Sequence, residues 1–130
     1  MAVQQKVVTQ GSVTIGPAQA SCAPFPSMES TIVLNGERFF GVKRADVVSI
    51  SSPVAFVDLL AGLTISAVRL LVLRVQAGSI VLRTSSAAGV DQVVNISDVV
   101  YISNPVAGTE LTAVSVQGTA NIEYLIAGDE

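Results

Sequence analysis

The chain has 130 residues, half of them hydrophobic, with seven basic and ten acidic side chains, a net charge of −3 and no histidine. This length and apolar content are sufficient for one folded domain, and they exclude a disordered tail. A disulfide scaffold is also excluded, because the chain contains a single cysteine. The sequence holds 22 valines, nine isoleucines and eight threonines, which fit pleated sheets better than helices, and it therefore predicts an all-β protein.

The low charge bears on the expected partners. Charged residues make up 13% of the chain, about half the share that is usual in globular domains. The basic residues are scattered singly, so the sequence offers no electropositive surface for nucleic acid. No apolar stretch reaches the ~20 residues of a membrane helix, and the first residues lack the apolar run of a secretory signal. We expect a protein made in the cytoplasm that binds neither nucleic acid nor membrane. Its surface either consists of uncharged polar residues such as Ser, Thr, Gln, Asn and Gly or is hidden against other subunits.

Residues 1–29 are predicted to form an extended N-terminal arm. Two short extended pieces are expected before residue 16, but Gly16-Pro17 and the Pro24-Phe25-Pro26 segment prevent a continuous helix and disfavour a central strand. An aromatic side chain such as Phe25 between two prolines is suited to anchor the arm in a pocket of a neighbouring subunit. It could equally cover the core of its own chain.

Turn signals become regular from residue 30, and residues 30–130 are predicted to form the β-sandwich domain. The apolar run at 31–34 is followed by Asn35-Gly36, a dipeptide that favours tight hairpin turns. A first hairpin is therefore predicted between this run and residues 38–42.

Two further hairpins are predicted from the same kind of signal. In Ala67–Val75 both alternating faces are mostly apolar, which is typical of a strand buried on two sides. Residues 76–79 are expected to turn this strand into a return strand at 80–84. The last hairpin is predicted between 111–116 and 121–126.

Short strands at 92–96 and 99–102 complete the expected elements, with a loop at 104–108. Strands separated by turns at this spacing are typical of sandwiches and barrels. The predicted fold is therefore an antiparallel β-sandwich, jelly-roll-like in its strand order.

The sequence contains no recognisable catalytic or metal-binding motif. Without histidine, the chain lacks the commonest general base and a usual metal ligand. A hydrolase would have to use carboxylates such as Asp91, Asp98, Glu110 and Glu123, which lie in no spaced motif and mostly near turns, where they stabilise the backbone locally. The sequence thus predicts a non-enzymatic protein without cofactor or metal, and a carboxylate hydrolase is the least favoured alternative.

The arginines are the remaining charged candidates. Arg69 and Arg74 are an odd number of residues apart on one predicted strand and should point to opposite faces. Each of them, like Arg83, is expected to form a salt bridge with a carboxylate such as Asp91 or Glu123, or to line a subunit contact. The predicted subunit contacts are Pro24, Phe25, Pro26, Arg69 and Arg74.

The second half of the chain, from near Ser49, resembles a known group of proteins. It contains the runs Ala67–Val75, Ile80–Leu82 and Val99–Ile102 and a closing segment that reads Gly-Thr-Ala-Asn-Ile-Glu-Tyr-Leu. This pattern is similar to small β-sandwich proteins of tailed-bacteriophage virions. The resemblance implies a structural role in the virion, as a head decoration, neck, tail or fibre component. It also implies a symmetric homo-oligomer, with a trimer favoured, in contact with other virion proteins.

One alternative function is a binding module. The loops at 85–91 and 104–110 would suit recognition of a carbohydrate or a peptide, because binding residues often lie on loops that a rigid sheet presents. This alternative and the structural role both predict a non-enzymatic β-sandwich.

Overall fold

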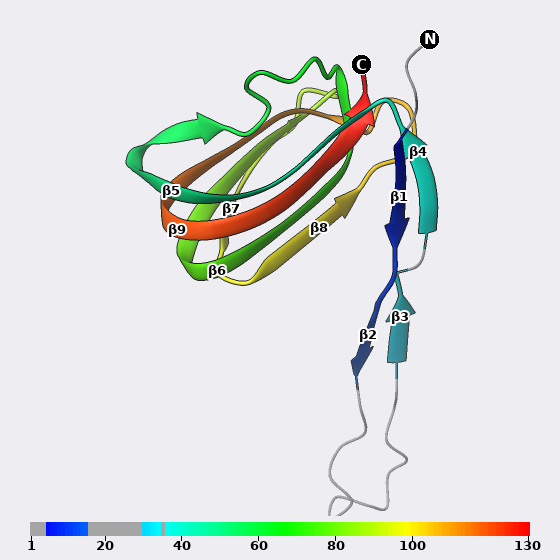
Figure 1. Ribbon diagram of the computed structural model, residues 1–130, viewed down its shortest axis with the longest axis horizontal. Coiled ribbons are helices and arrows are strands. Elements are labelled where there is room, and N and C mark those ends of the chain that lie inside the picture. Colours follow the sequence, from blue (N-terminus) through cyan, green and yellow to red (C-terminus); the bar gives the residue numbers. More distant parts are fainter. Residues whose placement is uncertain (1–4, 16–29, 35) are drawn as a thin grey trace, which may run out of the picture. The chain divides into compact units, whose positions relative to one another are not determined.

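The computed structural model describes residues 5–15, 30–34 and 36–130 (Figure 1). The described residues are all-β with antiparallel sheets and contain no helix, as the composition predicts. They belong to two compact units, a smaller one at Lys6–Phe39 and a larger one that contains Phe40–Glu130.

The smaller unit contains two pairs of short strands. These are β1 (Gln5–Thr9), β2 (Ser12–Ile15), β3 (Ser30–Val33) and β4 (Gly36–Phe40). β1 pairs with β4, and β2 pairs antiparallel with β3. Between the two pairs, the Leu34 N–H donates to the Gly11 carbonyl at 2.8 Å. Within the first pair, a 3.2 Å salt bridge joins Lys6 of β1 to Glu37 of β4.

The hairpin predicted across Asn35-Gly36 is wrong. β3 and β4 pair with β2 and β1 and not with each other, because the extended pieces before residue 16 supply partners for both strands. The division drawn from the sequence at residue 29 therefore falls between two strands, β2 and β3, that are hydrogen-bonded to each other. Pro24, Phe25 and Pro26 lie outside the described residues, and their role stays a prediction.

The larger unit is built on one antiparallel sheet. Its strands are β5 (Val42–Asp58), β6 (Ala67–Ser86), β7 (Asp91–Ile96), β8 (Val99–Ser103) and β9 (Leu111–Asp129). The order is β5-β9-β6-β7, and β8 pairs with the first half of β6 while β7 pairs with its second half. Because β9 follows the other side of β6 throughout, β7 and β8 act as one interrupted edge strand.

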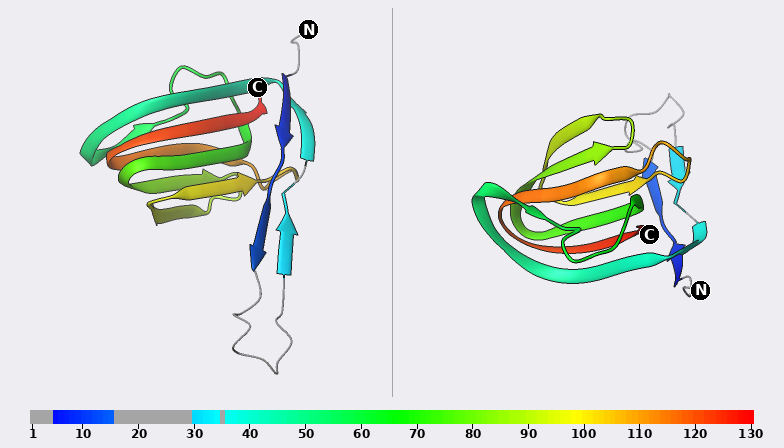
Figure 2. Two further views of the ribbon diagram at one scale, coloured as in Figure 1. Left: turned by 60° about the horizontal axis from the view of Figure 1, so that its bottom comes forward. Right: turned by 90° about the horizontal axis from the view of Figure 1, so that it is seen from above.

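The long strands fold back on themselves, as Figures 1 and 2 show for β5, β6 and β9. The irregularities align across neighbouring strands: Ser52, where the β5 register shifts, is opposite Gly118, and Gly78 is opposite Ala120. On the far edge, the break between β7 and β8 lies at Ser97-Asp98. The sheet thus bends along one line, and its two halves face each other as the layers of a sandwich do.

The predicted hairpins at 67–84 and 111–126 are also wrong, because β6 and β9 continue through the expected turns. Gly78 and Gly118 have φ angles of 91° and 137°, which allow β6 and β9 to bend together while their pairing continues on both sides of the bend. The expected short strands at 92–96 and 99–102 are confirmed by β7 and β8, and the loop after β8 is also confirmed. The jelly-roll order stays a prediction.

The core lies between the two halves of the bent sheet. Alternate side chains of β6 and β9 from both sides of the bend form one buried cluster, which includes Leu71, Leu73, Leu82, Val114, Val116, Ile122 and Ile126. Leu70 and Leu71 are adjacent and only 4% and 0% exposed, so the expected burial of this strand on both faces is confirmed at that point. The Arg44 guanidinium donates to the Leu59 and Ala61 carbonyls at 3.3 and 2.8 Å, which ties the loop after β5 to the sheet.

Candidate functional site

One half of the bent sheet is formed by the first parts of β5 and β6, the last part of β9, and β8. On its outer side, away from the core, this half carries two rows of side chains that cross the four strands. We call these eight residues the front face. The registers of β5, β9, β6 and β8 align Ala45, Leu125, Val72 and Tyr101 in the first row. They align Val47, Glu123, Arg74 and Val99 in the second row. In a strand, alternate residues share a face, so these side chains point away from the core.

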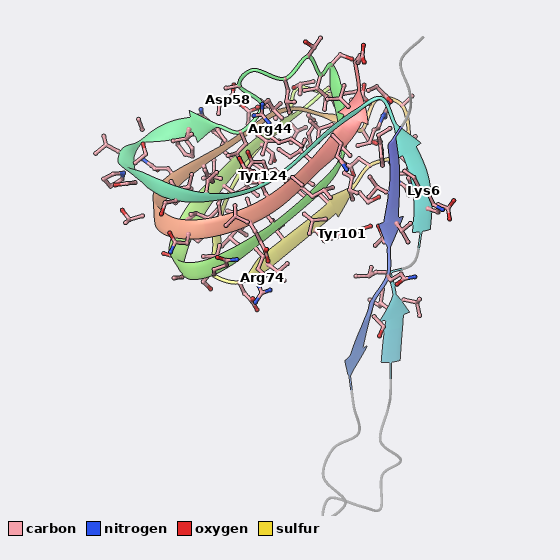
Figure 3. The ribbon with its side chains drawn as sticks, in the orientation of Figure 1. Lys6, Arg44, Asp58, Arg74, Tyr101 and Tyr124 are labelled. Carbon is pink, nitrogen blue, oxygen red and sulfur yellow. The ribbon has the colours of Figure 1, made fainter. Side chains whose placement is uncertain are left out.

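The front face is apolar and accessible. Val47, Val99 and Tyr101 are 62%, 58% and 37% exposed, and a shallow hollow of about 630 Å³ is lined by seven front-face residues together with Asp46 and Tyr124. Figure 3 labels Arg74 on β6 and Tyr101 on the neighbouring strand β8. Exposed apolar patches on folded domains often mark interaction sites.

The two charges of the front face form an ion pair on the central strands of the sheet. The Arg74 Nη1 atom lies 3.3 Å from Glu123 Oε1, and the two side chains are 64% and 39% exposed. The expected salt bridge of Arg74 is therefore confirmed. An exposed pair of this kind contributes only about 0–1 kcal/mol to folding.

Arg69 lies in a second cluster, at the end of the sheet. Its guanidinium contacts Glu110 Oε2 and Asp129 Oδ2, both at 3.1 Å, and donates to the Val106 carbonyl at 3.1 Å. The Arg69 side chain is only 17% exposed. The salt bridge expected of Arg69 is confirmed, and it holds the loop at 104–110 against β6 and β9.

The same cluster brings two loops together. The Ala87 N–H donates to the Glu110 carbonyl at 2.9 Å, so the loops at 85–91 and 104–110 lie side by side. Within them, Val90 and Val106 are more than half exposed. We call these two loops the loop pair.

Backbone hydrogen bonds lower the pKa of Glu110 below its usual value of 4.5. The N–H of Glu110 itself has the largest effect, partial desolvation opposes it, and the Gly108 N–H, at 2.7 Å, and the positive charge of Arg69 add to it. All these donors favour the ionised carboxylate.

Glu110→Gln is expected to weaken the pH dependence of folding stability. Because the pKa of Glu110 is lower in the folded protein, its ionised form stabilises the fold above about pH 4.5, and this contribution disappears as the pH falls towards the folded-state pKa. Urea unfolding, followed by circular dichroism at a series of pH values from neutral to acidic, measures how the free energy of unfolding depends on pH. The wild type should lose more stability on acidification than the variant. Equal losses in both proteins would contradict the claim that ionised Glu110 stabilises the fold.

Arg83 has a different environment from the one predicted. Its guanidinium lies 4.2 Å from the centroid of the Phe56 ring, a cation–π contact in place of the expected carboxylate partner. A smaller hollow of about 390 Å³ adjoins this contact, on the outer side of the other half of the sheet.

The four carboxylates considered for hydrolysis lie in different parts of the sheet and its loops. Glu110 and Glu123 contact different arginines, Asp91 begins β7, and Asp98 lies between β7 and β8. Among the described residues, no three acidic or cysteine side chains gather in a way that could hold a metal ion. In the same part of the chain there is no helix of the length and hydropathy needed to cross a membrane.

The structure thus separates the predicted site residues. Arg74 belongs to the front face, Arg69 contacts the loop pair from β6, and the three arm residues are outside the described part. The sequence also named Glu123, as a possible partner of an arginine, but it did not indicate the other six front-face residues.

No protein-family model, curated protein or solved structure matches this chain. The chain's own surfaces, the front face and the loop pair, are therefore the features that bear on its function.

Proposed function

We propose that this protein is a non-enzymatic structural component of a tailed-bacteriophage virion that acts through contacts between subunits. The observation that carries the proposal is the front face, an accessible apolar surface with two charges that compensate each other. Other parts of the strands also carry exposed apolar side chains, such as Val54 and Val93, which are 86% and 61% exposed. The resemblance of the second half of the chain to small β-sandwich proteins of virions supports the proposal that the protein is part of a virion.

The low charge supports the same role. An isolated domain usually covers its surface with charged side chains, whereas subunits of an assembly cover much of it with each other. With 13% charged residues, the chain is better suited to an assembly than to free solution.

Addition of the purified protein to phage particles that assembled without it tests the virion role. We expect the protein to sediment with the particles in a density gradient, at a fixed number of copies per particle. If it stays at the top of the gradient with particles that lack it, the virion role is wrong.

The loop pair supports a second candidate function, recognition of a carbohydrate or a peptide. The hydrogen bond between Ala87 and Glu110 joins the two loops into one surface, and Arg69 holds the loop at 104–110 through Val106 and Glu110. A glycan and peptide array tests this candidate. Binding that is lost in Val90→Asp and Val106→Asp but kept in Val54→Asp, a control at an exposed valine outside the loop pair, would favour recognition. An array without binding would exclude the ligands tested.

A further inference from the structure

We infer that two copies of this chain pair through their front faces, related by a two-fold axis that runs parallel to the strands between β9 and β6. This inference rests on the proposed function, because it names the partner of the same surface. The second copy would place its front face against that of the first, as the two layers of a β-sandwich do.

The row with the two charges is self-complementary under this rotation. Across β5, β9, β6 and β8 it reads Val47, Glu123, Arg74, Val99. The rotation reverses the order of the strands, so Arg74 of the second copy faces Glu123 of the first and its Val99 faces Val47. Each charge then meets an opposite charge and each valine meets a valine, as a two-fold interface between identical surfaces requires.

The other row is also complementary to the same row of a second copy in reversed strand order. It reads Ala45, Leu125, Val72, Tyr101, so the central Leu125 faces Val72 of the second copy. At the ends of the row, the ring of Tyr101 faces Ala45, the smallest side chain of the front face. The hollow of about 630 Å³ that these rows line provides space for the facing side chains.

The charges favour a second copy over other occupants. Arg74 and Glu123 compensate each other, so an acidic or a basic partner would be attracted by one and repelled by the other. A second copy presents both charges in the opposite order. A glycan would find one aromatic side chain on the front face, Tyr101, which is a small platform for stacking.

Charge reversal tests the pairing. In Arg74→Glu the front face carries two negative charges, and in Glu123→Arg it carries two positive charges, so each variant repels its own copies. We expect each alone to dissociate about 100-fold more readily than the wild type, because like charges at an interface cost several kcal/mol. An equimolar mixture should associate again, since a negative face then meets a positive one. Sedimentation velocity at matched concentrations measures all three samples.

The mixture separates this effect from the ion pair within each chain. Neither variant regains that internal pair on mixing, so recovery must come from contact between copies. The exposed pair of Lys6 and Glu37 provides the control: Lys6→Glu should leave the mass of the assembly unchanged.

The inference is overturned if either variant alone keeps the wild-type mass, or if the mixture stays dissociated. A wild type with an odd number of copies, such as the trimer that the resemblance favours, would also overturn the two-fold pairing and leave the proposed function intact. A monomeric wild type would overturn the pairing, and it would overturn the proposed function as well only if the chain also fails to bind particles that lack it.

Discussion

Gly78→Ala is expected to lower the free energy of unfolding by about 2–6 kcal/mol, because the substitution combines backbone strain with overpacking. The φ angle of Gly78 is 91°, a conformation that alanine adopts only with strain. A Cβ atom at this position would lie 2.6 Å from the Thr119 carbonyl oxygen and 3.2 Å from the Ala120 Cα atom. These are backbone atoms of the paired strand β9, so they cannot move without disrupting the bend.

Gly108→Ala is the matched control for this prediction. Gly108 has almost the same φ angle, 90°, but a Cβ atom there would meet nothing within 4 Å. We expect it to cost only the strain, about 1–3 kcal/mol. Chemical unfolding at one fixed protein concentration, followed by circular dichroism, measures both variants. Equal unfolding midpoints would show that β6 and β9 do not approach each other closely at the bend.

Leu73→Ala is expected to destabilise the protein by about 2–5 kcal/mol, the range for removal of a buried leucine side chain. Leu73 is 0% exposed and lies among the side chains that both halves of the sheet contribute to the core. Its removal leaves a cavity between two layers that the bend holds together. The expected result is a lower unfolding midpoint with an unchanged dependence on denaturant.

Leu63→Ala is the control for the core prediction, because Leu63 is partly exposed in the loop between β5 and β6. We expect a loss below about 1.5 kcal/mol, since less apolar surface returns to water. A similar loss for both leucines would mean that the two half-sheets do not share one core.

Most of the strands were predictable from the sequence, but their connections were not. Alternating and β-branched residues indicated extended structure in most of the strands that the structure describes, whereas no strand was predicted for most of β5. The segments around Gly78 and Gly118 contain a glycine among small and polar residues, which is equally compatible with a turn and with a bend. The choice depends on whether a neighbouring strand continues past the glycine, and that information is distant in the sequence.

For the candidate site, too, local features were predictable and the pairing of distant segments was not. The sequence indicated that Arg74 would find a carboxylate, and Glu123 was named as one possibility. It could not place Val47 and Val99 in the same row, because that row is set by the registers of three strand pairs. A shift of one residue in any register would move a side chain to the opposite face.

Light scattering of the wild-type chain over a wide range of concentrations tests most directly whether this protein works through contacts between its own copies. The account predicts a particle of at least twice the 13.4 kDa chain mass, with an even number of copies. A mass of 13.4 kDa at every concentration would contradict it.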